Sequence, residues 1–487
     1  MSSPLQLKEY GFVKQVHKSI AKIGGLANCM NGQLVYFGDL QTKGIIAGFD
    51  ENDILVLMLK TAENIKPNDK VYTKLETFGV PVGENFLGRI VNALCEPCDL
   101  KKEIQPADYF PIFQQAPGVL ERVPIKEVLE TGIKMIDMMI PLGKGQRELI
   151  IGDRMTGKTT IVLDTIINQK GKGIICIYCC IGKSQSTLAK AIRLLQKTHA
   201  LDYTIVVAAD ASAPLGQQYL APYVACSLGE YFMYKGMDVL VGFDDMTKHA
   251  WVYRQLSLLL ERSPGRDAYP GDIFYLHSQL IERAGKLSPE RGSGSMTFLP
   301  IVETLQGDVT GYVPSNLISM TDGQIYLSST LFSEGFKPAI DLGLSVSRIG
   351  NKVQWPAIRE LSGMLRLEYL KFKELERLTK IKSGISEEIE EKLKEKDILV
   401  ELLKQESNRP VSLQEQVVLL YALRQGFLKK CNIQQVREFK NRIRDFINQK
   451  DSQLLNKILA EKSLNQEMIS NIEKILLDYF KDNSSVE

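Results

Sequence analysis

The sequence predicts a multidomain α/β protein with an N-terminal β-barrel, a central parallel sheet covered by helices on both faces, and a C-terminal helical bundle. Three observations support this fold class: short β-like runs near the N-terminus, apolar strands alternating with helices in the middle, and helical periodicity alone at the end. The chain has 487 residues, more than one hydrophobic core usually serves. We therefore expect three domains, at residues 1–72, 73–352 and 353–487.

The first domain is predicted from three short runs of strand-forming residues. They cover residues 33–37, 44–49 and 54–59, and Gly, Asn and Asp turn signals separate them. This pattern predicts a small β-barrel. Between about residues 73 and 120 the chain is interrupted by Gly and Pro, and the run at 110–113 indicates an extended linker or an edge segment.

The central domain is organised around a stretch that fits Gly-x-x-x-x-Gly-Lys-Ser/Thr. Its residues, with the one that follows, are Gly152, Asp153, Arg154, Met155, Thr156, Gly157, Lys158, Thr159 and Thr160. In such a loop backbone N–H groups surround a polyphosphate, Lys158 reaches the terminal phosphates and Thr159 offers its hydroxyl to Mg²⁺. An apolar run at 147–151 precedes the loop, and apolar residues at helical spacing follow it at 160–168. Because a chance match on a surface loop would lack this context, we expect a phosphate-binding loop.

Alternating strands and helices follow the loop. Strand-like runs lie at 174–181, 204–209 and 238–243, with helical stretches at 184–196 and near 217–234. Such alternation predicts a parallel sheet that binds its ligand at the carboxyl ends of the strands. Asp244 follows the third run, and its carboxylate could hold the Mg²⁺ shell opposite Thr159, directly or through water. Asp245 is the second choice, and for either residue a helix N-cap is the alternative.

Helical patterns fill the C-terminal part of the chain. Leu361, Leu365, Phe372 and Leu375 trace one helical face, and residues 386–396 form a highly charged stretch with both signs interleaved. We interpret the charged stretch as a solvated helix surface. The prediction for this region is a helical bundle.

Composition excludes several classes of function. A net charge of +2 gives no electrostatic reason to expect nucleic acid or an acidic lipid surface as the main partner. No 18-residue uncharged apolar run and no signal-peptide core occur, so we expect a cytosolic chain that meets membranes through other proteins. The eight cysteines are scattered, which favours buried reduced thiols. The pair Cys95 and Cys98 is a weak metal signal, because no second pair accompanies it.

Seven segments resemble the alpha subunits of rotary F-type ATP synthases. They lie at 143–154, 221–223, 229–232, 253–262, 264–272, 307–309 and 344–350, and the longest read GKGQRELIIGDR and YRQLSLLLER. The barrel, the phosphate-binding loop and the helical tail also follow in the order of that family. The resemblance extends over nearly the whole chain and is far more specific than the loop alone.

The resemblance implies an architecture and a set of partners. We expect a RecA-like P-loop core and an alternating hexamer of three alpha and three beta subunits around a gamma central stalk. A peripheral stalk and a membrane ion-translocating sector would complete the complex, at the cytoplasmic face of the cell inner membrane. ATP or ADP with Mg²⁺ would sit at each subunit interface. The complex would make ATP from ADP and phosphate with a proton or sodium gradient, and only sites built mainly on beta would be catalytic.

The catalytic residues implied by the family can be compared with this chain. Beta subunits carry a water-orienting Glu after the second core strand, where this chain has Lys183 and alpha subunits usually have Gln. A protonated lysine cannot be that base, so the chain's own site should be inactive. The alternative is that Lys183 is a surface residue and that Gln185 or Glu148 does the work. Arg348 matches the arginine that alpha subunits extend into the neighbouring beta site, whereas without the resemblance it could equally be a structural ion-pair partner.

The chain also differs from the alpha-subunit pattern at the adenine side of the site and in a segment used for assembly. Gln405 and Phe332 match residues near the adenine pocket, while Lys337 and Ser407 stand where the family has Arg and Gln. Barrel-like sequence starts near Glu9, so a helix that docks the delta subunit is expected to be missing. Two other readings are a catalytic hexameric ATPase, which a Glu at position 183 would favour, and an RNA-translocating hexameric helicase, which the near-neutral charge disfavours.

Overall fold

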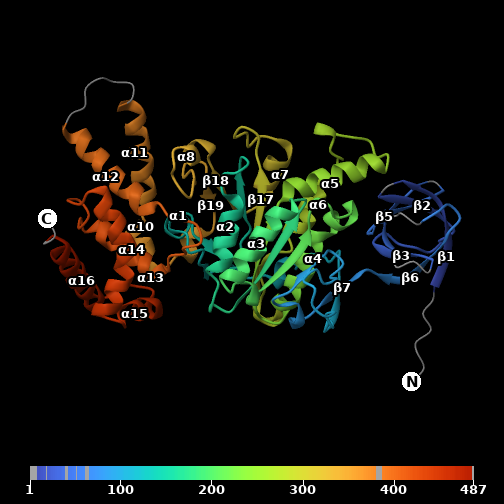
Figure 1. Ribbon diagram of the computed structural model, residues 1–487, viewed down its shortest axis with the longest axis horizontal. Helices are drawn as coiled ribbons and strands as arrows, with labels where there is room; N and C mark the ends of the chain where they lie inside the picture. Colours follow the sequence, from blue (N-terminus) through green and yellow to red (C-terminus); the bar gives the residue numbers. More distant parts are fainter. Residues whose placement is uncertain are drawn as a thin grey trace. The chain divides into compact units, whose positions relative to one another are not determined.

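The computed structural model describes residues 8–17, 19–38, 42–50, 52–60, 65–379 and 387–484. Figure 1 shows the chain coloured from its N-terminus to its C-terminus, and contacts divide it into two compact units. Unit 1 comprises Met1–Pro124, Lys170–Thr304 and Asp308–Thr321; unit 2 comprises Ile125–Gln169, Leu305–Gly307 and Asp322–Glu487. Because the units interleave along the sequence, the domain boundaries at residues 72 and 352 stay predictions.

Six strands of unit 1 close into a β-barrel, drawn in blue in Figure 1. They are β1 (Lys8–His17), β2 (Ile20–Gly24), β3 (Gln33–Phe37), β4 (Lys43–Phe49), β5 (Ile54–Met58) and β6 (Lys70–Thr77), in the order β1-β2-β5-β4-β3-β6. Alternate side chains such as Val35 and Phe37 on β3 fill the interior. The predicted barrel is confirmed, and the three predicted runs correspond to β3, β4 and β5. The docking helix concerns the residues before β1, which lie outside the described part of the chain.

The sheet of unit 1 consists mainly of parallel strands. Its order is β17 (Ser295–Glu303), β15 (Asp238–Asp244), β13 (Ile174–Ile181), β14 (Thr204–Ala209) and β8 (Ile90–Val91), with β16 (Gly285–Lys286) antiparallel to β17. Nearly every residue of β13 is buried. Since successive side chains of a strand point to opposite faces, both faces of this sheet are covered, as predicted.

The segment expected to be a linker contributes strands of its own. β8 extends the parallel sheet at its edge, where it pairs with β14. β7 (Gly79–Val82) pairs antiparallel with β9 (Asp108–Pro111), which confirms the edge segment predicted at residues 110–113. The helices of unit 1 are α3 (Gln185–Lys197), α4 (Leu215–Tyr234), α5 (Met246–Leu259), α6 (Ile273–Ile281) and α7 (Tyr312–Met320). Of these, α4 packs against β13, β14 and β15, and it also contacts α5.

Unit 2 contains a three-stranded sheet of order β19 (Val346–Ser347), β18 (Gly323–Leu327) and β12 (Glu148–Gly152). β12 and β18 are parallel, and β19 is antiparallel to β18. A short ladder joins β10 (Val128–Leu129) to β11 (Leu142–Gly143), with α1 (Lys134–Met139) between them. After β12 the chain enters α2 (Lys158–Ile167). The strand, loop and helix predicted around the glycine-rich motif are therefore present.

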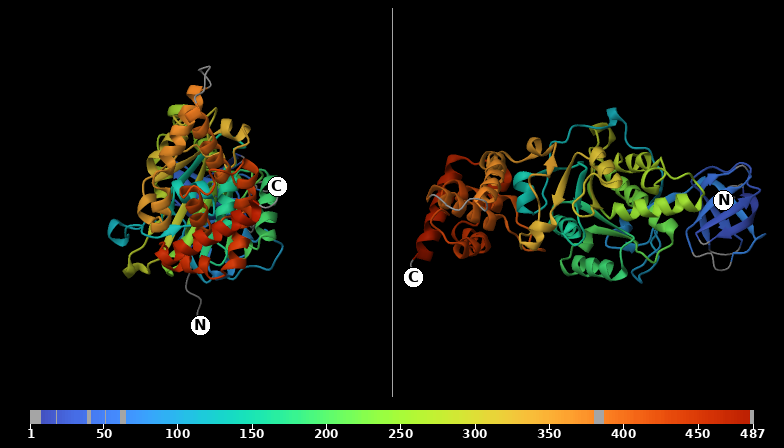
Figure 2. Two further views of the ribbon diagram at one scale, coloured as in Figure 1. Left: turned by 90° about the vertical axis from the view of Figure 1, so that its left-hand side faces the viewer. Right: turned by 90° about the horizontal axis from the view of Figure 1, so that it is seen from above.

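The remainder of unit 2 is helical and appears in orange and red in Figure 2. It comprises α8 (Ser329–Ser333), α9 (Gly350–Val353), α10 (Pro356–Ser362), α11 (Leu365–Thr379), α12 (Glu387–Leu403), α13 (Leu413–Arg424), α14 (Ile433–Lys450), α15 (Leu454–Glu461) and α16 (Gln466–Ser484). The predicted helical C-terminal domain is confirmed. The prediction of a single helical face from Leu361 to Leu375 was wrong in one respect. A turn at Gly363 and Met364 interrupts the helix between α10 and α11.

The charged stretch at 386–396 is helical within α12, as predicted, although Ser386 lies outside the described residues. Its side chains from Glu390 to Lys392 are mostly exposed, and Lys396 forms an ion pair with Glu376 at 2.7 Å. This is the solvated helix surface expected of an interleaved charge pattern. Within the described residues, none of the helices has the length and apolarity needed to cross a membrane.

Candidate functional site

Two glycines shape the phosphate-binding loop between β12 and α2. Gly157 is the N-cap of α2 and has φ 99°, a left-handed conformation that L side chains rarely adopt. At Gly152 a Cβ atom would lie 2.4 Å from the carbonyl oxygen of Leu327 in β18. Both positions thus require glycine, one for backbone conformation and the other for close packing of β12 on β18.

Polar contacts hold the loop in a defined conformation. The Lys158 ammonium donates to the carbonyl oxygen of Gly152 at 2.8 Å and to that of Asp153, and its side chain is only 5% exposed. The Thr156 hydroxyl donates to the Asp153 carbonyl at 2.8 Å. The Asp153 carboxylate accepts from the Gly307 N–H at 2.8 Å. Contacts within the chain therefore fix the conformation of the loop, and phosphate oxygens could replace the backbone carbonyls as partners of the lysine.

The remaining loop residues differ in exposure. Arg154 and Met155 are exposed at the crest of the loop, Met155 at 90%. Thr159 and Thr160 lie half-buried in the first turn of α2, where backbone N–H groups lack partners within a helix. A helix N-terminus of this kind attracts anions through its free N–H groups and its dipole. The arrangement suits a polyphosphate.

Gln405, predicted on the adenine side, lies in the segment that follows α12. Its amide nitrogen donates to the carbonyls of Gly132 at 2.7 Å and Arg409 at 2.9 Å, and its amide oxygen accepts from the Lys134 N–H at 3.0 Å. The Asn408 N–H in the same segment donates to the carboxylate of Asp164 on α2 at 2.9 Å. The hydrogen bonds of Gln405 thus hold the segment after α12 in place. Asn408 binds the same segment to α2, the helix that follows the phosphate-binding loop.

Phe332 lies in α8, and its side chain is 36% exposed. The Lys337 ammonium lies 5.1 Å from the centroid of its ring, a cation–π contact. The Lys337 carbonyl in turn accepts from the Gln405 N–H at 2.9 Å. Phe332, Lys337 and Gln405 are therefore neighbours in unit 2, as the prediction of one adenine pocket requires.

Two buried ionisable side chains, Lys134 and Asp164, lie beside the segment that contains Gln405. Burial lowers the pKa of Lys134 to about 7, although its ammonium donates to the carbonyls of Leu402 and Lys404 at the end of α12. Burial raises the pKa of Asp164 to about 6, against the hydrogen bond from Asn408. Sequence reasoning missed both residues, because nothing in their spacing distinguishes them from ordinary helix residues.

Arg348 follows β19 at the edge of the sheet of unit 2. Its N–H donates to the Asp322 carbonyl at 3.0 Å, which fixes the backbone, while the side chain is exposed. In the described part of the chain no ion pair holds its guanidinium, although its charge lowers the pKa of Glu148 against the stronger effect of burial. The alternative that Arg348 is a structural ion-pair partner therefore gains no support from the described residues.

Asp244 and Lys183 meet in unit 1. Asp244 is the last residue of β15, and the Lys183 ammonium lies 2.6 Å from its Oδ1 atom. Asp245 is the N-cap of α5 and accepts from the Lys248 N–H at 2.8 Å, so the N-cap alternative applies to Asp245. The Lys183 side chain is only 16% exposed, which argues against the alternative of a surface lysine.

The two other groups considered as a base have structural partners. Glu148 on β12 is completely buried and accepts from the Gln146 amide at 2.8 Å, and burial raises its pKa well above its usual value. Gln185 is exposed and donates to the Ser212 hydroxyl at 3.0 Å. Neither arrangement resembles an ionised carboxylate poised to orient water.

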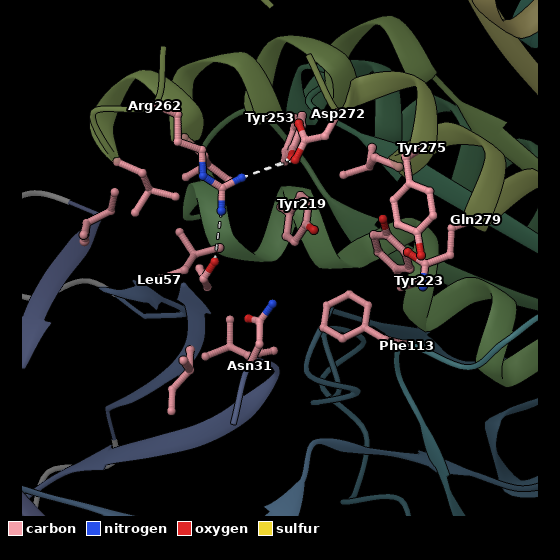
Figure 3. A pocket seen from close by; sticks show the side chains of 17 residues that line it. Asn31, Leu57, Phe113, Tyr219, Tyr223, Tyr253, Arg262, Asp272, Tyr275 and Gln279 are labelled. Carbon is pink, nitrogen blue, oxygen red and sulfur yellow. Dashed lines mark hydrogen bonds and ion pairs between the residues drawn. The ribbon is translucent and has the colours of Figure 1, made fainter. Parts of the chain in front are cut away.

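Unit 1 also contains a cavity of about 380 Å³ that the sequence did not reveal. Figure 3 shows Tyr219, Tyr223 and Tyr253 on one side of it and Asn31 and Leu57 from the barrel on the other. The Tyr253 hydroxyl donates to the carboxylate of Asp272 at 2.7 Å. Tyr219 and Tyr223 lie on α4 and Tyr253 lies on α5, whereas Asn31, Leu57 and Phe113 come from much earlier in the chain, so no local pattern marks the cavity.

The cysteines carry no visible metal site. All eight are free, with Cys95 buried and Cys98 exposed. Among the residues that the structure describes, no group of three or more His, Cys, Asp or Glu side chains could hold a metal ion.

Comparison with known proteins places this geometry in a family. Three family models match the chain: the beta-barrel domain of the ATP synthase alpha/beta family at residues 7–74, its nucleotide-binding domain at 132–347, and the C-terminal domain of the alpha/beta chain at 354–479. ATP synthase subunit alpha of Petrotoga mobilis is 44% identical over 474 residues, 97% of this chain and 94% of the relative. ATP synthase subunit alpha of Clostridium botulinum strain Hall is 45% identical over 469 residues, 96% of this chain and 93% of the relative. Because these matches cover nearly its whole length, the chain belongs to the ATP synthase alpha/beta family and, within it, to the alpha subunits.

Proposed function

We propose that this chain is the non-catalytic, nucleotide-binding alpha subunit of a rotary ATP synthase that makes ATP from ADP and phosphate with a proton or sodium gradient. One contrast carries the proposal. The phosphate-binding loop is fully formed around Lys158, whereas position 183, where a water-orienting carboxylate would be needed, holds an ammonium paired with Asp244. The loop can bind a nucleotide, and a protonated lysine at position 183 cannot act as the base that hydrolysis needs.

We propose the assembly that the resemblance to ATP synthase alpha subunits implies. Three copies of the chain would alternate with three beta subunits around a gamma central stalk, and a peripheral stalk would join them to the membrane ion-translocating sector. The complex would lie at the cytoplasmic face of the cell inner membrane, with this chain as a peripheral component. Nucleic acid is not among the proposed partners.

ATP and ADP are the proposed cofactors, and Mg²⁺ fits only part of the predicted ligand set. The Thr159 hydroxyl in the first turn of α2 suits an ion carried on the nucleotide. Asp244 does not fit as a second, direct ligand. Its Oδ1 atom is paired with Lys183 at 2.6 Å, and its Oδ2 atom accepts from the Tyr178 hydroxyl at 2.8 Å.

Arg348 is the proposed contribution of this chain to catalysis. Its exposed guanidinium follows the edge strand β19, and the hydrogen bond from its N–H to the Asp322 carbonyl fixes the backbone there. Reaching a neighbouring beta site, it would stabilise charge on the phosphoryl oxygens of the transition state, an effect worth roughly 10³ to 10⁵ in rate in related systems. This is catalysis in trans, from a subunit whose own site does not turn over.

The test combines nucleotide binding with steady-state hydrolysis. The purified chain should bind ATP without turnover, and the complex reconstituted with beta and gamma subunits should hydrolyse ATP. Arg348→Ala should lower the hydrolysis rate of the complex by at least about a hundredfold, because the arginine acts only in the transition state. Arg359→Ala, at another exposed arginine of unit 2, is the matched control and should leave the rate unchanged.

Two outcomes would overturn the proposal. Turnover by the isolated chain at the rate of the complex would show a catalytic site of its own. Full activity of the Arg348→Ala complex would remove the role in trans, provided that gel filtration shows the complex to be intact.

A further inference from the structure

A cavity of about 520 Å³ lies in the helical part of unit 2. It lies among α11, α12 and α13, and Figure 1 shows α11 and α12 side by side. Its volume is within the range of about 300–1,000 Å³ that is usual for small-molecule sites. Its apolar wall includes Leu365, Phe372 and Leu375 of α11, Ile398 and Leu399 of α12, and Leu423 of α13.

The wall includes a helical face that the sequence marks. Leu365, Phe372 and Leu375 recur at helical spacing along α11, as expected of a face directed into a bundle. Leu365 is only 1% exposed, so neighbouring side chains cover it, whereas Phe372 and Leu375 remain half-buried. Transfer of such apolar surface from water to an apolar ligand is favourable. The cavity therefore offers apolar surface that the bundle itself does not cover.

The two acidic side chains in the lining of the cavity are both paired. Nη1 of Arg424 donates to Oε1 and Oε2 of Glu368 at 2.8 and 3.0 Å. The Lys429 ammonium lies 3.1 Å from Oε1 of Glu395. Because these contacts compensate both carboxylates, the remaining charged side chains of the lining decide the sign of its net charge.

Two lysines give the lining an excess of positive charge. Lys371 of α11 and Lys392 of α12 both line the cavity and are exposed, and neither forms an ion pair within the part of the chain that the structure describes. Lysine side chains can lay their methylene groups along apolar surface while the ammonium stays in water. A ligand with an apolar chain and one anionic end therefore matches both parts of the lining. A cationic ligand would meet two uncompensated like charges.

We propose that this cavity binds an anionic amphiphile, a free alkyl carboxylate of medium length, with its chain against Phe372 and Leu375 and its carboxylate paired with Lys371 and Lys392. The lining shares no residue with the phosphate-binding loop, so the inference adds a ligand class to the proposed function and does not rest on it. A partner helix would need a groove long enough for apolar anchors at i, i+4 and i+7. A cavity of this volume with two ammonium groups suits a small acid better.

The experiment titrates the full chain with decanoate by calorimetry, below the concentration at which decanoate forms micelles. Decanoate should bind at one saturable site. Butyrate has a shorter chain and decyltrimethylammonium the opposite charge, so both should bind at least about tenfold more weakly. Lys371→Gln/Lys392→Gln should weaken decanoate binding by about tenfold or more, because the carboxylate loses both charged partners.

A matched double variant controls for the change of charge. Lys394→Gln/Lys474→Gln removes two exposed lysines of α12 and α16 that do not line the cavity, and it should leave the Kd for decanoate unchanged. Thermal unfolding verifies that each variant is folded.

A tryptophan in the wall locates the bound ligand. Phe372→Trp should change its fluorescence when decanoate is added, after subtraction of the signal of the unaltered chain, which contains two tryptophans. Phe446→Trp, on α14 and outside the lining, should show no such change. A response from Phe446→Trp alone would place the ligand elsewhere and overturn the inference.

Other results would also overturn it. If decanoate does not bind, or binds equally well to Lys371→Gln/Lys392→Gln, the lysines do not select an acid. If decyltrimethylammonium binds as tightly as decanoate, the cavity accepts apolar chains without regard to charge. If the chain binds vesicles of anionic lipid but not free decanoate, the lysines serve a membrane surface. A separate titration with ATP tests the proposed nucleotide site, so failure of one proposal is distinguishable from failure of the other.

Discussion

The carboxylate of Glu230 and the guanidinium of Arg283 form a two-pronged ion pair in which both side chains are completely buried. Nε of Arg283 lies 2.6 Å from Oε1 of Glu230, and Nη2 lies 2.6 Å from Oε2. Arg283 also donates to the Ile112 carbonyl and to the Ser227 hydroxyl, both at 2.9 Å. The pair joins α4 to the segment after α6 and to the chain that follows β9.

Replacing Arg283 by Met should destabilise unit 1 strongly, because Glu230 would remain as a buried carboxylate without a cation. Removing one partner of such a pair costs about 3–5 kcal/mol. We expect the urea midpoint to fall accordingly, and the double variant Glu230→Gln/Arg283→Met to recover part of the loss.

Arg291→Met provides the comparison for this prediction. Arg291 pairs with Glu121, but its side chain is 58% exposed, so solvent screens the pair and its loss should lower the urea midpoint far less than the loss of Arg283. Equal losses in the two arginine variants would show that burial does not determine the strength of the Glu230 pair.

Gly152→Ala should disrupt the phosphate-binding loop. The added Cβ atom would lie 2.4 Å from the Leu327 carbonyl oxygen, so β12 and β18 would have to separate. Overpacking of this kind costs about 1–3 kcal/mol, and the shift should weaken ATP binding because it moves the loop backbone. Gly271→Ala is the control, since a Cβ atom there meets nothing within 4 Å. An unchanged Kd for ATP in Gly152→Ala would contradict this account.

The elements that could be predicted from local pattern are those whose burial follows a simple period. β3, β13 and β14 match the predicted runs, since continuous or alternating apolar residues bounded by turns admit few other structures. The two-residue strand β8 was missed, because it exists only through its pairing with β14. The break between α10 and α11 was also missed, since apolar spacing continues across Gly363.

The candidate site was predictable only where a motif fixes the chemistry. The loop from Gly152 to Thr160 has the predicted strand, loop and helix context, because its glycines meet strict steric demands. The ion pair between Lys183 and Asp244 could not be foreseen, since it joins the ends of two neighbouring strands. The roles of Arg348, Phe332 and Gln405 stay predictions, because they depend on a ligand or on a neighbouring subunit.

Acid should destabilise the protein through His249. Its ring is completely buried, with Nε2 donating to the Tyr219 carbonyl at 3.0 Å, and burial lowers its pKa from 6.5 to about 4. As the pH falls from 6.5 to 4, the unfolded chain takes up a proton that the folded chain does not. The free energy of unfolding should therefore decrease over this interval, by roughly 1.4 kcal/mol for each unit of pKa difference.

Urea titrations between pH 7 and 4 measure this dependence. His249→Gln keeps the donor to Tyr219 and should flatten the pH profile, although His277, whose pKa burial lowers to about 3, contributes in the same direction. His199→Gln should leave the profile unchanged, because His199 is 72% exposed. If the free energy of unfolding fell more steeply with decreasing pH in His249→Gln than in the unaltered chain, the prediction for His249 would be wrong.

The contacts of Gln405 predict how its variants should affect nucleotide choice. Both polar ends of its amide are used within the chain, on Gly132, Arg409 and Lys134. Gln405→Ala should therefore loosen the segment beside α2 and weaken ATP and GTP binding by the same factor, as expected when hydrogen bonds of about 1 kcal/mol each are lost. Gln449→Ala, at an exposed glutamine of α14, is the matched control. Calorimetric titration with ATP and with GTP measures the two Kd values. If Gln405→Ala changes their ratio, the Gln405 amide contacts the nucleotide base and gives up one of its carbonyl partners to do so.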